Sequence, residues 1–268
     1  MLKQALQIVI ERAPQVFRPG TKLYKSSSGP AILTATSIRS RAISSLTRTS
    51  DYSKTISTRS FSTSRTMAST KSFIEVVKGR RSYYLLNKDA PISDDAIVQL
   101  VNDTVLNLPS FFNTQTARLV VLLKAEHELF WDMVGEVLKP IVPEADFPAT
   151  EQKLGMFKAG YGTILFFEDP APVKALQEAY PIYADHMPTW SEHTSAMHQF
   201  VLWAGLEAEG FGANLQHYNP VIDLKVQNHW KVPLEWKLRA QLVFGGKAGE
   251  AGEKTFKPLE DRVFVHGK

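Results

Sequence analysis

The chain has 268 residues, of which 44% are hydrophobic and 22% are charged, a balance typical of a globular protein. It has no cysteine, which excludes disulfides, cysteine-ligated metal centres and thiol nucleophiles. No apolar run approaches the roughly 18 residues of a membrane-spanning helix, so membrane insertion is not expected.

The net charge of +4 is unevenly spread, and residues 1–71 predict a leader rather than part of the fold. Residues 1–72 hold 12 Lys or Arg against two acidic residues, and 25 of the 72 are Ser or Thr. This composition is typical of a mitochondrial transit peptide, and a disordered basic tail is the alternative. Translation starting at Met67 would instead give a cytoplasmic protein without the leader.

Residues 72–268 are expected to form one domain. Residues 73–268 carry 19 basic and 25 acidic groups, a balance of −6, so no nucleic-acid partner is expected. In the first half, Ser93 is the predicted N-cap of a helix, because its apolar residues recur at helical spacing. The elements expected there are a short helix before Gly79, a helix from Asp94, a strand at 118–123 buried on both faces, a helix at 126–138 and a loop at 141–150.

The second half predicts more strands and one long helix. Gly210 is expected to end that helix. The pair Gly245-Gly246 is expected to end a strand. The expected elements are a buried strand at 162–167, a helix from Thr189 to about Glu209, a strand at 236–244 and a short last strand at 263–265. Helices and few strands in mixed order indicate a central sheet wrapped by helices.

The familiar catalytic and metal-binding patterns are missing from the sequence. There is no Gly-x-Ser-x-Gly nucleophile elbow. His193 and His198 are five residues apart, on different faces of the predicted helix, so a shared metal is not expected. The lone Gly-x-Gly at 210–212 follows a helix rather than a strand, which does not fit a dinucleotide-binding site. No catalytic side chain and no metal ligand is predicted.

Four polar segments beside loops remain as candidates for ligand binding. Two arginines and a serine at a helix end can clamp a phosphate, although a surface arginine pair is more often simply solvated. Polar groups at the start of a buried strand can hydrogen-bond a ligand. The segments are Arg80-Arg81-Ser82, Pro109 to Gln115, Gln216 to Pro220 (expected as a loop between helices) and Gly252 to Glu260.

Together and in this order, the four segments resemble the FMN-dependent nitroreductase family, in the branch that includes the yeast fatty-acid-repression-mutant protein and its homologue. The resemblance covers nearly all of residues 72–267. It implies an α+β, nitroreductase-like fold with a central mixed β-sheet surrounded by helices. It also implies a homodimer with two FMN sites at the interface, each built from both chains.

The resemblance also implies roles for individual residues. Phe111 stands where many relatives carry a second Ser, and Phe256 where many carry a basic residue. The implied FMN contacts are Arg80, Arg81, Ser82, Lys254 and Lys257 at the phosphate, Ser110, Phe111 and Asn113 along the ribityl chain and ring edge, Gln216, His217, Tyr218 and Asn219 beside the ring, and Lys153 at the pyrimidine end.

The implied activity is a ping-pong reaction in which NADH or NADPH reduces the flavin and a nitroaromatic or quinone acceptor reoxidises it. Because the cofactor carries the chemistry, such an enzyme needs no catalytic acid–base pair. The alternative is a flavin-binding redox or stress regulator of lipid metabolism with little turnover.

Overall fold

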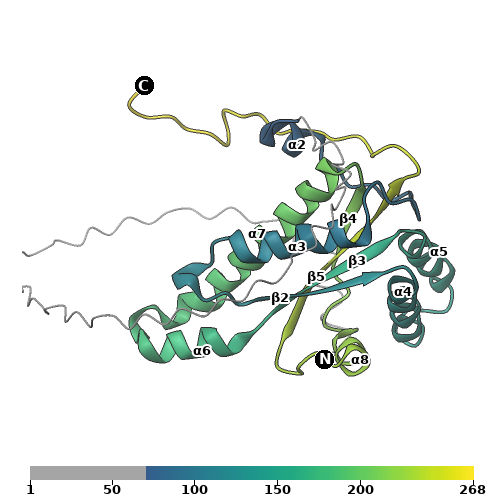
Figure 1. Ribbon diagram of the computed structural model, residues 1–268, viewed down its shortest axis with the longest axis horizontal. Helices are drawn as coiled ribbons and strands as arrows, with labels where there is room; N and C mark the ends of the chain where they lie inside the picture. The colour runs from purple at the N-terminus through teal and green to yellow at the C-terminus, as the bar shows by residue number, and fades with distance from the viewer. Residues whose placement is uncertain (1–70) are drawn as a thin grey trace, which may run out of the picture. The chain divides into compact units, whose positions relative to one another are not determined.

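The computed structural model describes residues 71–268, and the predicted leader lies outside this part (Figure 1). None of its helices is long and apolar enough to cross a membrane. In chain order the elements are α2 (Phe73–Gly79), β1 (Leu86–Asn87), α3 (Asp94–Asn107), the 3₁₀ helix η1 (Phe111–Asn113), β2 (Ala117–Leu123), α4 (Ala125–Leu138), α5 (Phe147–Lys158), β3 (Gly162–Glu168), α6 (Pro170–Ala179), the 3₁₀ helix η2 (Pro181–His186), α7 (Met187–Ala208), β4 (Gly212–Gln216), α8 (Asp223–Trp230) and β5 (Lys237–Lys247).

The described strands form a five-stranded sheet in the order β1-β5-β3-β2, with β4 also paired to β5. Every ladder between these strands is antiparallel. Parallel pairing is confined to one isolated bridge between Ser82 and Ala213, so the sheet is less mixed than expected. The expectation of a central sheet surrounded by helices is confirmed.

Strand β3 divides the hydrophobic core into two halves because its side chains alternate between the faces of the sheet. Ile164 and Phe166 pack with residues of α3 and α7. Leu165 and Phe167 pack with residues of α4, α5 and α8 on the other face. Figure 1 shows the same division, with α3 and α7 on one side of the sheet and α4, α5 and α8 on the other.

Several predicted helix boundaries are confirmed. The Ser93 side chain accepts a hydrogen bond from the Ala96 N–H at 3.3 Å, as an N-cap does. Helix α7 ends at Ala208, and Gly210 follows with φ +93°, a conformation that favours glycine. His193 is exposed and His198 is buried, so the two lie on different faces of α7 as predicted.

Four expectations about elements are wrong. Strand β2 is at the end of the sheet and mostly only half-buried, whereas burial on both faces was expected. The expected loop at 141–150 gives way to α5 at Phe147, where Pro148 is in the first turn of the helix, a position that needs no N–H. Strand β5 continues through Gly245-Gly246, and residues 263–265 form no strand. Tertiary contacts therefore explain the glycine pair, whereas the apolar triplet is exposed and has no strand to pair with in the described part of the chain.

Candidate functional site

Segment 80–82 is fixed between helix α2 and strand β4. Helix α2 begins with a capping box between Ser72 and Glu75 and ends at Gly79, after which the backbone of Arg80 is extended. Ser82 then bridges Ala213, and the N–H of the next residue donates to the Ala213 carbonyl at 3.0 Å. The arginine pair and the serine therefore lie beside strand β4.

The guanidinium of Arg80 lies over the ring of Trp203, 4.2 Å from its centroid. Partial burial and the neighbouring Arg81 lower the pKa of Arg80. Within residues 71–268 no carboxylate pairs with this guanidinium, and Glu207 is bound instead by Lys247 at 2.9 Å. The N–H donors of Arg80 are thus available to an anion.

The C-terminal segment 248–268 contains no helix or strand and begins beside Arg81. The Arg81 guanidinium donates a hydrogen bond to the Gly252 carbonyl. Lys254, two residues further, is exposed with its Nζ 5.1 Å from the centroid of the Phe256 ring. Lys257 is also exposed, and neither lysine has an ion pair in the described part of the chain. The contact with Gly252 brings the start of this basic segment to segment 80–82.

Segment 216–219 begins at Gln216, the last residue of strand β4, so it leads from a strand to α8 and not from helix to helix as expected. The Gln216 amide donates to Asn214 Oδ1 at 2.8 Å. Gln241 of β5 accepts from the Tyr218 N–H at 2.7 Å and donates to Asn219 Oδ1 at 3.2 Å. Gln241 is fully buried, so these two hydrogen bonds hold the segment against strand β5.

The two titratable side chains of this segment are shifted by burial. Burial raises the pKa of Tyr218 to about 12 and lowers the pKa of His217. The Tyr218 ring packs edge-on against Trp131, with 5.5 Å between centroids. The Tyr218 ring therefore belongs to the core, and His217 is the side chain of this pair left to contact a ligand.

Lys153 is on α5, with its Nζ 5.9 Å from the centroid of the Phe157 ring. Phe157 is in ring contact with Tyr218, with 6.4 Å between centroids. Helix α5 therefore lies against segment 216–219. No hydrogen bond or ion pair of the Lys153 side chain is recorded within residues 71–268, so its charge is available at this side of the segment.

Loop 110–115 is held in a conformation that non-glycine residues rarely adopt. Phe112, Asn113 and Gln115 have φ values of 48°, 54° and 50°. The Ser110 hydroxyl accepts from the Gln115 N–H at 2.9 Å, which closes the loop. The Phe112 ring stacks on Tyr180, with 5.4 Å between centroids. Such local strain is typical of segments that clamp a ligand.

The predicted residues fall into two groups within one chain. Segments 80–82, 216–219 and the start of 248–268 lie around strand β4, with Lys153 on the adjoining helix. Loop 110–115 instead contacts Tyr180, between α6 and η2, and Trp190 in the first turn of α7. No hydrogen bond, ion pair or ring contact among the described residues joins the two groups directly.

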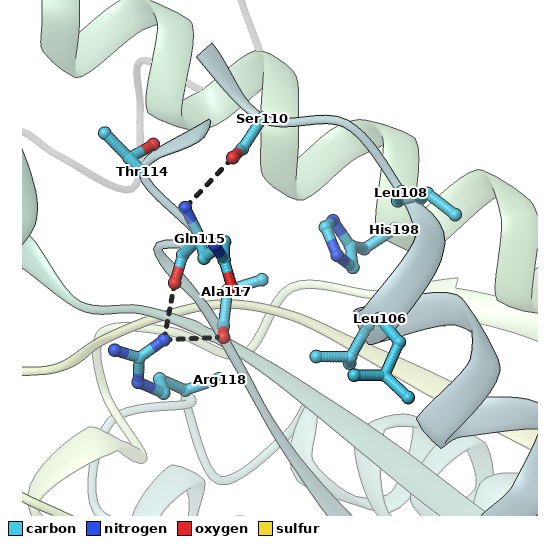
Figure 2. A pocket seen from close by; sticks show the side chains of 9 residues that line it. Leu106, Leu108, Ser110, Thr114, Gln115, Ala117, Arg118 and His198 are labelled. Carbon is cyan, nitrogen blue, oxygen red and sulfur yellow. Dashed lines mark hydrogen bonds between the residues drawn. The ribbon is translucent and has the colours of Figure 1, made fainter. Parts of the chain in front are cut away.

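A pocket of about 400 Å³ beside loop 110–115 is lined by His198, which the sequence did not single out for this place (Figure 2). His198 is 3% exposed, and burial lowers its pKa. Its Nδ1 is 2.8 Å from the Thr194 carbonyl oxygen. From the sequence, His198 could be placed only on the buried face of the predicted helix. Many core residues share this property, so it does not indicate a pocket.

Glu168, at the end of β3, is a second buried titratable group that the sequence did not single out. Burial raises its pKa, and the Ser191 hydroxyl donates to its Oε2 at 2.5 Å. Its Oε1 is buried without a partner among the described residues. Within residues 71–268 no cluster of three metal-ligating side chains is present.

The family model described as "Nitroreductase family" matches residues 77–246 of this chain. Two proteins of Saccharomyces cerevisiae, the putative nitroreductase HBN1 and nitroreductase FRM2, are each 32% identical to it. The match spans 74% of this chain and 100% of HBN1, and 71% of this chain and 95% of FRM2.

Solved structures show the same fold. Nitroreductase CinD from Lactococcus lactis in complex with chloramphenicol is 42% identical, with a TM-score of 0.67, and the match covers 73% of this chain and 100% of CinD. A putative nitroreductase from Exiguobacterium sibiricum in complex with FMN is 16% identical, with a TM-score of 0.54, over 74% of this chain and 99% of that one. The second likeness extends to the fold alone.

Proposed function

Since the chain belongs to the nitroreductase family, we propose that it is an FMN-dependent oxidoreductase that uses NADH or NADPH to reduce nitroaromatic or quinone acceptors. Family membership and the relatives support an oxidoreductase of nitro-type substrates. The observation that carries the cofactor assignment is the set of uncommitted donors around β4. FMN, the proposed cofactor, is bound in the structure of the Exiguobacterium sibiricum protein, which shares the fold of this chain.

The residues around β4 fit a flavin phosphate. The Arg80 guanidinium and the Ser82 hydroxyl beside β4 make no ion pair or hydrogen bond within residues 71–268, although the Glu207 carboxylate acts on Arg80 electrostatically. The ammonium groups of Lys254 and Lys257, on the segment that follows Gly252, are likewise not engaged in an ion pair or hydrogen bond within these residues. A phosphate close to a dianion would accept from these donors, and each charge-assisted contact stabilises by about 1.5–3 kcal/mol. Trp203 supports the Arg80 guanidinium plane from one side, which keeps the donors oriented.

The other segments would contact different parts of FMN. His217 and the backbone fixed by Gln241 would lie beside the ring, and Lys153 would stabilise negative charge at its pyrimidine end. Loop 110–115 would contact the ribityl chain and ring edge through Ser110 and Asn113. When bound, FMN would supply the chemistry, accepting a hydride from the nicotinamide and passing electrons to the acceptor in a ping-pong sequence.

A homodimer would complete the site. Loop 110–115 and the residues around β4 are not in polar or ring contact within one chain, which is compatible with a site to which a second copy supplies one of the two groups. Apolar side chains on α3, α7 and the C-terminal segment are exposed, including Leu106, Phe200 and Phe264. In the proposed dimer, such side chains would be buried against the second copy.

The first test is the absorbance spectrum of the purified full chain incubated with FMN. The protein is expected to retain flavin absorption after gel filtration, and anaerobic NADH or NADPH is expected to bleach it. Lys254→Ala combined with Lys257→Ala should weaken FMN binding by about 10²-fold or more, because two charge-assisted contacts are lost.

The matched control is Lys139→Ala combined with Lys174→Ala, which removes the same charge from α4 and α6 and should leave the FMN affinity unchanged. Full flavin retention by the Lys254 and Lys257 double variant would contradict the phosphate assignment. Steady NADH or NADPH oxidation with a nitro acceptor supports the enzyme. A flavin that is bound but turns over negligibly would favour the regulator of lipid metabolism instead.

A further inference from the structure

The pocket beside loop 110–115 has a polar side and an apolar side (Figure 2). Leu106, Leu108 and Ala117 form part of the apolar wall. Ser110, Gln115 and His198 supply polar groups. Figure 2 shows the His198 imidazole facing Ser110 and Gln115 across the hollow. At about 400 Å³, the space lies in the size range of small-molecule sites.

The hydrogen bond to Thr194 fixes which nitrogen of His198 carries the proton. A carbonyl oxygen only accepts, so the Nδ1 atom 2.8 Å from it must be the N–H donor. In the neutral ring the other nitrogen, Nε2, then has a free lone pair. Nε2 has no hydrogen-bond partner among residues 71–268, although the residue is 3% exposed. Nε2 is not one of the fully buried atoms that lack a partner, so it is the part of the imidazole that is open to the pocket. The pocket therefore presents an acceptor that a ligand donor can reach.

The charges around the pocket select an uncharged ligand. Arg118, the cation at its edge, donates to the carbonyls of Gln115 and Ala117 at 2.7 and 3.0 Å. Its second nitrogen pairs with Asp169 at 2.9 Å. Its donors and its charge are thus committed, and a ligand carboxylate would gain little from them. A nitro or quinone oxygen is also disfavoured at Nε2, because both atoms are acceptors.

We infer that His198 Nε2 is a ligand-binding acceptor that takes a hydrogen bond from an uncharged hydroxyl group in this pocket. The inference rests on the proposed function, because Ser110 belongs both to this pocket and to the proposed flavin loop. Two sources carry the same chemistry: a hydroxyl of the ribityl chain of FMN, or a hydroxyl on an aromatic electron acceptor. His198 would then select for ligands that carry this donor.

The first arm measures FMN affinity by fluorescence titration of the full chain. His198→Leu removes the acceptor, and His198→Gln keeps an acceptor oxygen. If the donor is a ribityl hydroxyl, His198→Leu weakens FMN binding fivefold to tenfold, the loss expected for one neutral hydrogen bond, and His198→Gln restores part of it. His229→Leu, at an exposed position of α8 away from loop 110–115, is the matched control and leaves the affinity unchanged.

The second arm measures the binding of 2-naphthol and of its methyl ether, 2-methoxynaphthalene, by calorimetry without a reductant. If the hydroxyl that donates to His198 belongs to the aromatic electron acceptor, the wild-type protein binds the naphthol at least fivefold more tightly than the ether. His198→Leu then binds the two equally. The titrations are run with and without FMN, so the result does not depend on flavin binding or turnover and separates this inference from the proposed function.

A third measurement uses only the wild-type chain, so it remains informative if the His198 variants do not fold. In ¹⁵N-histidine NMR of the wild-type chain, His198 is expected as the Nδ1–H tautomer with an unprotonated Nε2. The Nε2 resonance is expected to shift when FMN or 2-naphthol binds. The inference is overturned if His198 is protonated at Nε2. It is equally overturned if neither ligand moves that resonance and His198→Leu changes neither FMN affinity nor the preference for the naphthol.

Discussion

His127 shows how burial fixes the protonation state of a single residue. It is a fully buried residue of α4 that faces Thr163 of β3, and burial lowers its pKa to about 4. Its Nδ1 is 2.8 Å from the Thr163 hydroxyl, and its Nε2 is 3.3 Å from the Lys158 carbonyl. Trp131 Nε1 also donates to Thr163 Oγ1 at 3.1 Å. The carbonyl requires Nε2 to be the donor, so Thr163 donates to Nδ1 and the ring is neutral.

This network predicts that stability is lost on mild acidification. The pKa of His127 is about 4 when folded and 6.5 in the unfolded reference, so between these values the unfolded chain binds the extra proton. Stability therefore falls as the pH falls through this window. From pH 8 to pH 5 the free energy of unfolding should drop by about 2 kcal/mol on account of His127.

Urea unfolding of the wild type, His127→Gln and His193→Gln at both pH values measures this contribution. His127→Gln should be less stable at pH 8 but should lose less stability on acidification, whereas the exposed His193→Gln should behave like the wild type. An equal loss of stability in all three proteins would show that His127 does not carry the effect.

At the scale of an element, strand β5 explains why a glycine pair need not end a strand. A Cβ on Gly245 would lie 2.9 Å from the backbone nitrogen of Tyr161, 3.1 Å from the Cα of Gly160 and in collision with the Asn87 carbonyl oxygen. Glycine is required there because neighbouring backbones approach closely. The strand continues through the pair to reach β1, which pairs with it at Gly246 and Lys247.

Gly245→Ala should therefore destabilise the fold by about 1–3 kcal/mol, the usual cost of overpacking a tight site. Gly252→Ala is the matched control, because a Cβ there meets nothing within 4 Å. Thermal unfolding of both variants against the wild type measures the difference. Equal melting temperatures for the two variants would mean that the backbone contact at Gly245 relaxes without cost.

At the scale of the whole molecule, we propose that the site is shared between two copies of the chain. Loop 110–115 and the donors around β4 are in separate groups, and apolar residues near the loop are exposed. Leu106, at the end of α3, is 79% exposed and lies at the edge of the pocket that adjoins the loop. An exposed leucine at this place is expected to be buried by the second copy.

The full chain should sediment as a dimer, and Leu106→Glu should shift it toward monomer and weaken FMN binding, because a buried carboxylate without a partner is costly. Leu234→Glu, before β5 at a residue that is 57% exposed, should leave the dimer intact. Sedimentation velocity with detection of the flavin tests both. A wild-type monomer that binds FMN fully would rule out a site shared between chains.

The sequence determined those features that depend on neighbouring residues. Capping at Ser93, the turn at Gly210 and the apolar runs of β3 and α7 are local patterns, and the order of four polar segments was enough to identify the nitroreductase family. The leader at 1–71, the limits of the domain and the individual flavin contacts remain predictions.

Tertiary structure decided the features that depend on distant residues. The order of strand pairing places β2 at the edge of the sheet. The backbones of Asn87 and Tyr161 lie so close to Gly245 that only glycine fits there, and β5 continues through this position. Which side chains share a pocket was also decided there, since His198 meets loop 110–115 only when α7 packs beside it. A local pattern specifies which face of an element is apolar, but the partner that covers this face is chosen by packing across the whole domain.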